Sequence, residues 1–90
     1  MLRVLVVDDS ATARELLTQV LERDPGIVVV GAARGGREAL RLAQELRPDV
    51  ITMDIYMPDL DGFQATKEIM IAAPTPTVIV SASTQSSVKR

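Results

Sequence analysis

Three aspartates stand directly after two aliphatic runs of this 90-residue chain, and they are the residues best suited to carry chemistry. Asp8 and Asp9 follow the run over residues 2–7, and Asp54 follows the run over residues 50–53. A nearly continuous aliphatic composition is typical of buried parallel strands, and open parallel sheets bind ligands at the carboxyl ends of their strands. The spacing therefore predicts that these carboxylates converge on one crevice.

The predicted carboxylate cluster favours a bound cation. Two carboxylates about 4 Å apart repel by roughly 4 kcal/mol at an effective dielectric constant near 20, so either a pKa rises or a divalent cation binds. The chain has no His and no Cys, so its metal ligands must be oxygen atoms, which favours Mg²⁺ or Ca²⁺. Mg²⁺ commonly adds phosphate oxygens to one or two carboxylates, and a carboxylate is a competent nucleophile towards a phosphoryl group. These residues indicate phosphoryl transfer onto an aspartate at a magnesium site.

A hydroxyl and two further acids belong to the same region of the predicted sheet. Ser81 follows another aliphatic run, residues 77–80, and could donate to phosphoryl oxygens. A single Asp after a strand is most often a turn former or a helix cap, but acids at two strand ends and a hydroxyl at another favour a site. Asp59 and Asp61 are interpreted instead as a solvated turn that helps to initiate the following helix.

Composition excludes several classes of function. Ten basic and twelve acidic residues give a net charge of -2, so the chain has no polybasic footprint for nucleic acid. The lack of Cys excludes disulfides, thiolate metal sites and thiol catalysis. The apolar run at the start is far shorter than a signal peptide core or a membrane span. We therefore expect a cytoplasmic protein with no membrane insertion and no direct nucleic-acid partner.

The elements that would position these residues alternate along the chain. Strands are expected over four runs, residues 2–7, 27–30, 50–53 and 77–80. Helices are expected between them, the first capped by Ser10, the second ended by Pro48 and the third starting at Phe63. This alternation with short connections predicts an open parallel α/β sheet with right-handed crossovers.

Three strings of residues, 6–10, 53–62 and 78–82, resemble the receiver domains of two-component signalling, and the resemblance covers the whole chain in order and spacing. It implies a flavodoxin-like doubly wound parallel sheet with the strand order 2-1-3-4-5. This chain would supply four strands and three helices of that fold. Because the family's fifth strand carries a phosphate-binding Lys that would lie beyond Arg90, we expect residues 1–90 to be a receiver domain that is incomplete at its C-terminus.

The resemblance also implies a role for each site residue. Asp54 would be the phosphoacceptor, and Asp9 and Asp54 would bind Mg²⁺ directly together with the backbone carbonyl of Tyr56. Asp8 would act mostly through water, and Ser81 would be the switch hydroxyl that reorganises around the phosphoryl group. The implied partners are a histidine kinase, which donates the phosphoryl group, and a downstream output domain or partner protein.

Within the family, residues 24–33 and 74–81 are most similar to the receiver of the chemotaxis protein-glutamate methylesterases, which carry a catalytic domain downstream. No G-x-S-x-G element occurs, so methylesterase chemistry cannot reside in these ninety residues. The chain could catalyse only its own phosphorylation and dephosphorylation.

Two other functions compete with the phosphoacceptor hypothesis. A receiver-like interaction module that is not phosphorylated is favoured by the missing Lys, since Lys89 lies too early to take that place, but the intact acids and Ser81 argue against it. A haloacid-dehalogenase-like phosphatase would need a second acid two residues after Asp54, where Tyr56 stands. We also expect self-association, because without a fifth strand residues 77–80 form an unpaired, uncharged edge.

Overall fold

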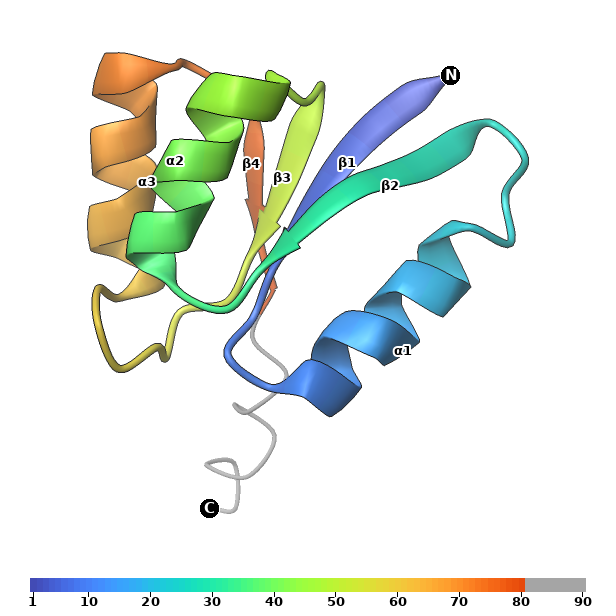
Figure 1. The fold of residues 1–90 in the computed structure, drawn as a ribbon, viewed down its shortest axis with the longest axis horizontal. Coiled ribbons are helices and arrows are strands. Elements are labelled where there is room, and N and C mark those ends of the chain that lie inside the picture. The colour runs from blue at the N-terminus through green and yellow to red at the C-terminus, as the bar shows by residue number, and fades with distance from the viewer. Residues whose placement is uncertain (81–90) are drawn as a thin grey trace.

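Four parallel strands form one sheet in the order β2-β1-β3-β4 (Figure 1). The computed structural model describes residues 1–80. The strands are β1 (Leu2–Val7), β2 (Ile27–Ala33), β3 (Val50–Met53) and β4 (Thr77–Ile79). The chain passes outwards from β1 to β2 and then crosses back to β3, so the strand order reverses between β1 and β3. This order confirms the flavodoxin-like doubly wound arrangement for the four strands, and its reversal point is where such sheets bind ligands.

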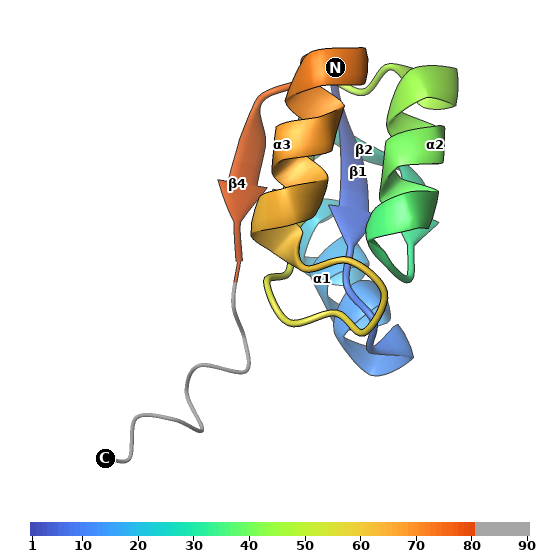
Figure 2. The ribbon, with the colours of Figure 1, turned by 90° about the vertical axis from the view of Figure 1, so that its left-hand side faces the viewer.

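Three helices cover the two faces of the sheet unequally. They are α1 (Ala11–Leu21), α2 (Gly36–Leu46) and α3 (Gly62–Ala72). Helices α2 and α3 pack against each other on one face, and α1 lies alone on the other (Figures 1 and 2). Within residues 1–80, no helix combines the length and the apolar character that a membrane span requires.

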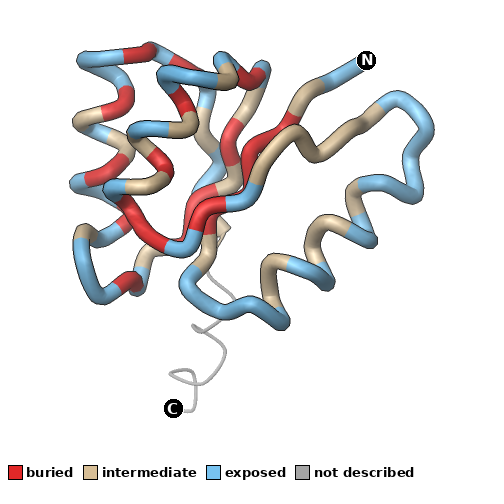
Figure 3. Tube along the Cα trace, viewed as in Figure 1, coloured by how far each residue is buried: buried red, intermediate tan, exposed pale blue. Residues whose placement is uncertain are grey.

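The hydrophobic core lies between the sheet and the pair α2 and α3. The side chains of Leu5, Ile51, Met53 and Ile69 are fully buried there. Small residues line the inner faces of the helices, namely Ala39 and Ala43 in α2 and Ala65 in α3. In contrast, α1 has no buried residue, and Figure 3 shows the buried positions gathered on the strands and on the inner sides of α2 and α3.

The predicted strand bounds differ from the observed ones mainly at β2. The sequence predicted residues 27–30, but the strand continues to Ala33. The register with β1 shifts between Val4, which pairs with Val29, and Leu5, which pairs with Gly31. A bulge of this kind adds one residue to one strand and lets pairing resume. Pairing therefore runs to the carboxyl end of β1, where Val7 lies beside Ala33.

Candidate metal centre

The carboxyl ends of β1 and β3 bring three acidic side chains together. The backbone N–H of Asp8 donates to the carbonyl of Ala33 at 3.1 Å, and that of Asp54 donates to the carbonyl of Val7 at 3.0 Å. The sheet ladder thus extends into the first acid after each strand. One carboxylate oxygen from each of Asp8, Asp9 and Asp54 lies within 4.8 Å of the others. Acids 45 and 46 residues apart in sequence therefore share one site at the predicted edge of the sheet.

The three acids differ in burial, and this sets their electrostatics. Asp54 is only 6% exposed, whereas Asp8 is half-buried and Asp9 is exposed. Burial raises the pKa of Asp54 above its ordinary value, and the charges of Asp8 and Asp9 raise it further. The backbone N–H groups of Ile55 and Tyr56 act against this shift by hydrogen bonding to the Asp54 carboxylate. A cation beside Asp54 would favour its ionised form.

The chemistry of the donor set fits a hard divalent cation. All three side chains offer carboxylate oxygens, one from a buried residue and two from a more open rim. Mg²⁺ is held in proteins by one or two carboxylates, water and phosphate oxygens. The partly open cluster leaves room for such additional ligands.

The turn after β1 is fixed by its own side chains. The Asp8 carboxylate accepts from the Ser10 backbone N–H at 2.9 Å, and the Ser10 hydroxyl accepts from the Ala13 N–H at 3.2 Å. Ser10 therefore caps α1, as predicted from the sequence. Arg14, one turn into the helix, donates to the Asp8 carbonyl at 2.8 Å. These contacts tie the start of α1 to the acid pair.

The loop after Asp54 returns to pack against it. The Gly62 N–H donates to the carbonyl of Ile55 at 2.8 Å, which closes residues 55–61 into a tight loop. A Cβ at position 62 would collide with the backbone carbonyl of Asp54, so only glycine fits there. The Asp61 carboxylate accepts from the Gln64 N–H at 2.9 Å and caps α3. The prediction that Asp61 initiates the third helix is confirmed, and that helix starts at Gly62, one residue before the predicted start.

Asp59 has a different role from the one that the sequence suggested. Asp59 is exposed and lies in the turn before α3, as predicted, but the prediction that it helps to initiate α3 was wrong, because Asp61 caps that helix. Its carboxylate accepts from the backbone N–H groups of Gly36 at 3.0 Å and Arg37 at 3.2 Å, at the start of α2. The bond from Arg37 is the main cause that holds the pKa of Asp59 below its ordinary value. The signal in the sequence was Gly35-Gly36, since a Cβ at Gly35 would meet the Asp59 carboxylate oxygens at 2.7 and 2.9 Å.

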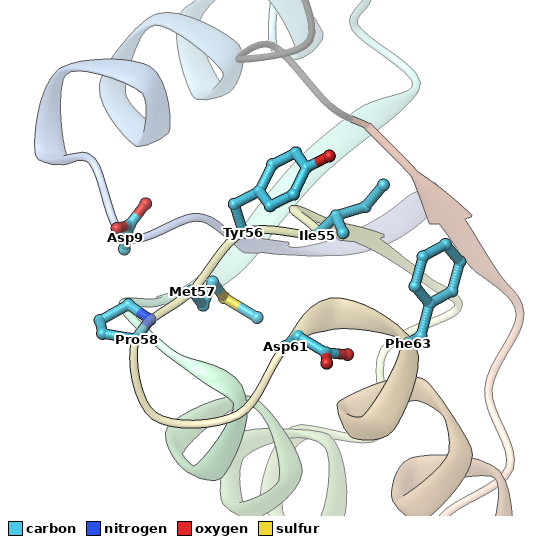
Figure 4. Close-up of a pocket in the computed structure, with 7 residues that line it drawn as sticks. All are labelled: Asp9, Ile55, Tyr56, Met57, Pro58, Asp61 and Phe63. Carbon is cyan, nitrogen blue, oxygen red and sulfur yellow. The ribbon is translucent and has the colours of Figure 1, made fainter. Parts of the chain in front are cut away.

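An open pocket of about 470 Å³ lies beside the acid cluster (Figure 4). It is lined by Asp9, Ile55, Tyr56, Met57, Pro58, Asp61 and Phe63. Tyr56 and Phe63, the only aromatic residues of the chain, are 61% and 62% exposed. Sequence reasoning singled out Tyr56 for its backbone carbonyl and missed Phe63. Ser81 lies outside the described residues, so the structure does not place the predicted switch hydroxyl.

Comparison with known proteins identifies the family. The model of the response regulator receiver domain matches residues 4–90. A protein-glutamate methylesterase/protein-glutamine glutaminase of Myxococcus xanthus is 56% identical over 80 residues, which are 89% of this chain and 23% of that protein. A relative of the same description from Carboxydothermus hydrogenoformans is 55% identical over 84 residues, 93% of this chain and 24% of that protein. The chain thus spans about a quarter of the length of these curated relatives.

Solved structures agree with the family match. The response regulator domain of Thermotoga maritima CheB superposes with a TM-score of 0.89 at 52% identity, covering 91% of this chain and 61% of that one. A chain of the CheX-CheY-BeF3-Mg²⁺ complex of Borrelia burgdorferi gives a TM-score of 0.83 at 31% identity, covering 90% of this chain and 62% of the matched chain. The chain belongs to the receiver-domain family of response regulators, and its sequence is similar to the receiver regions of protein-glutamate methylesterases.

Proposed function

We propose that the chain is a phosphoacceptor switch that takes a phosphoryl group onto Asp54. The observation that carries this proposal is the convergence of three carboxylates within 4.8 Å at the point where the strand order reverses. Asp54 is the buried member of the cluster and the one whose pKa is raised. A cation bound beside Asp54 would favour the ionised form of its carboxyl group. In that form the carboxylate can act as the nucleophile in phosphoryl transfer.

The transfer step requires positioning more than covalent chemistry. A carboxylate oxygen of Asp54 attacks phosphorus, and a P–O bond forms as the P–N bond to a phosphohistidine of a histidine kinase breaks. The bonding electrons leave with the imidazole, which takes a proton from water. We propose that Asp9, Asp54 and the backbone carbonyl of Tyr56 hold Mg²⁺, with Asp8 acting through water. When bound, Mg²⁺ neutralises charge on the phosphoryl oxygens.

The output of the switch is proposed from the relatives. Ser81 is proposed as the hydroxyl that donates to the new phosphoryl group, and its movement would signal to an output domain or partner protein. Several relatives are named protein-glutamate methylesterases, and this chain spans about a quarter of the length of each. We infer that the receiver regulates a chemotaxis methylesterase domain and works in the cytoplasm, where histidine kinases present their phosphoryl groups.

Phosphorylation with a small donor tests the proposal. The chain is incubated with acetyl phosphate and Mg²⁺, and the modified residue is located by mass spectrometry. We expect one base-labile adduct on Asp54, which Asp54→Asn abolishes and which Asp24→Asn, a change at an exposed turn, leaves intact. Equal incorporation at another acid in Asp54→Asn would overturn the site assignment. No incorporation by a chain that binds Mg²⁺ would favour the alternative, a receiver-like interaction module that is not phosphorylated.

A further inference from the structure

The loop that joins β3 to α3 is fastened to α2 by one side chain. Residues 55–61 leave the sheet at Asp54 and border the pocket beside the acids (Figure 4). The two ends of the loop are held locally, by the bond from Gly62 to Ile55 and by the Asp61 cap. Within residues 1–80, the bonds of the Asp59 carboxylate are the only hydrogen bonds that join residues 57–60 to another element.

The start of α2 is built to receive this carboxylate. The N-cap residue of α2 is Gly35, so the helix has no side-chain cap of its own. Both oxygens of Asp59 are used, Oδ1 for the Gly36 N–H and Oδ2 for the Arg37 N–H. Free N–H groups at a helix start favour a carboxylate by hydrogen bonding and by the helix dipole. Asp59 therefore supplies from 23 residues away the cap that α2 lacks.

The two glycines at the start of α2, the N-cap Gly35 and the first helical residue Gly36, leave the space that this approach needs. A Cβ at Gly35 would meet both Asp59 carboxylate oxygens, at 2.7 and 2.9 Å. A Cβ at Gly36 would meet the Leu60 Cβ at 2.7 Å and its backbone carbonyl oxygen at 2.8 Å. Asp59 and Leu60 therefore lie so close to Gly35 and Gly36 that a Cβ at either glycine would not fit. We name the contact of Asp59 and Leu60 with Gly35, Gly36 and Arg37 the loop clamp.

The loop clamp joins the site to the hydrophobic core. Helix α2 buries Ala39 and Ala43 against the core, and Leu60 packs on the same core cluster. Tyr56, whose carbonyl is proposed to complete the cation site, lies in the clamped loop, two residues after Asp54. Groups that orient metal ligands without touching the ion control affinity through the precision of that placement.

We propose that Asp59 is a positioning residue of the cation site, which holds the loop and its Tyr56 carbonyl in register with Asp9 and Asp54 through the loop clamp. The inference rests on the proposed function, because it assumes that Mg²⁺ binds at the acid cluster. Asp59 does not belong to the cluster of carboxylates within 4.8 Å, so its removal leaves every proposed ligand in the chain.

Magnesium titration of clamp variants tests the inference. Tyr56 is the only tyrosine and the chain has no tryptophan, so intrinsic fluorescence reports on the loop itself. We expect Asp59→Ala to weaken Mg²⁺ binding about tenfold, the lower end of the range for groups that orient metal ligands. Asp59→Asn, which keeps one acceptor oxygen, should recover part of the affinity. Without Mg²⁺, Tyr56 of Asp59→Ala should also be quenched more strongly by acrylamide.

Matched variants separate positioning from charge and from folding. Glu38→Gln removes the same charge near the same end of α2 but leaves the loop clamp intact. It should bind Mg²⁺ within about twofold of the parent, well below the tenfold effect of an orienting group. Gly35→Ala should weaken binding as Asp59→Ala does, and the double variant should be no worse than either, because both break one contact.

Each result decides either the inference or the function beneath it. If the parent chain itself fails to bind Mg²⁺, the proposed function is wrong. If the parent binds and a folded Asp59→Ala chain binds equally well, the loop clamp is structural only and the inference is overturned. Equal weakening by Glu38→Gln would assign the effect to charge and overturn it as well. Should Asp59→Ala fail to fold, Asp59→Asn and Gly35→Ala carry the same comparison.

Discussion

The ionised carboxylate of Asp54 is buried next to two other acids, which disfavours the folded state. Removing its charge should therefore stabilise the fold. The pKa of Asp54 is raised in the folded chain, mainly by burial and then by Asp8 and Asp9. Below the ordinary pKa the residue is protonated in both states and costs nothing. As the pH rises past that value, the unfolded state ionises more readily, and the penalty on folding becomes complete above the raised pKa.

Asp54→Asn should therefore stabilise the metal-free chain at neutral pH. We expect a gain of about 1 kcal/mol or more in the free energy of unfolding, since about 1 kcal/mol is the repulsion of one charge pair about 4 Å apart even with the full screening of bulk water. The gain should fade as the pH falls towards the ordinary aspartate pKa. Urea denaturation at several pH values measures it, with Glu15→Gln on the exposed side of α1 as the control. A destabilised Asp54→Asn chain at neutral pH would contradict the electrostatic account.

Magnesium binding should depend on Asp9 and Asp54 together. Asp9 is exposed and Asp54 is buried, yet their carboxylates belong to one cluster. Isothermal titration calorimetry of the metal-free chain should show weak Mg²⁺ binding that Asp9→Ala or Asp54→Ala abolishes. Binding at ten times the dissociation constant should also stabilise the parent by about 1.4 kcal/mol. Equal affinity in both variants and the parent would place the cation elsewhere.

The sequence predicts the acids of the site better than it predicts their supports. Asp8 and Asp54 could be placed because each stands next to a buried strand, and parallel strands end at one edge. Asp59 could not, because its partners are backbone N–H groups 22 and 23 residues away. Every residue type except proline offers the same backbone N–H donor, so such a partner cannot be recognised from the sequence. Only the glycine pair at the start of α2 indicated the contact.

At the scale of elements, the local sequence marks the starts of helices as clearly as it marks the strands. Ser10 and Asp61 cap α1 and α3, and both caps could be predicted from local spacing. The bulge in β2 could not, because it appears only when the strand pairs with β1. The aliphatic run alone ends at Val30, while pairing continues through Gly31 and Ala33. Local patterns thus predict that an element exists, and tertiary pairing decides where it ends.

Gly62→Ala should destabilise the chain although it introduces a better helix former. Alanine favours a helix interior over glycine by about 1 kcal/mol, but a Cβ here would collide with the backbone carbonyl of Asp54. Backbone cannot yield as a flexible side chain can, so we expect a net loss of about 2 kcal/mol or more. Urea denaturation measures the loss. Gly26→Ala, whose Cβ would meet only the side chain of Asp24 at 3.3 Å, should change stability much less.

At the scale of the whole molecule, the two faces of the sheet are covered unequally. Helices α2 and α3 bury one face, while α1 packs on β1 and β2 at the other. In register, Val6, Thr52 and Val78 lie side by side on β1, β3 and β4. Val6 is fully buried but Val78 is 53% exposed. The exposure of these three aligned side chains therefore rises from β1 to β4, the last strand of the sheet within residues 1–80.

This unequal cover predicts that the 90-residue chain associates with itself. Strand β4 carries Val78 and Ile79 and no charged side chain, and an edge strand that no charge protects can pair with another chain. Leu16 and Val20 add exposed apolar surface on α1, at 60% and 46% exposure. Sedimentation velocity at micromolar concentration should show a dimer or a larger assembly. Val78→Lys should shift the chain towards monomer, because a charge on an edge strand opposes pairing.

An exposed apolar residue on the opposite face provides the control for this assembly. Ile71 is 77% exposed on α3, so Ile71→Lys adds the same charge to the same chain on a helix and not on the strand β4. If association depends on β4 and α1, this variant should sediment like the parent, whereas general hydrophobic aggregation would respond to both changes. A single monomeric species with a cooperative melt would show instead that the 90-residue chain suffices for a stable receiver fold.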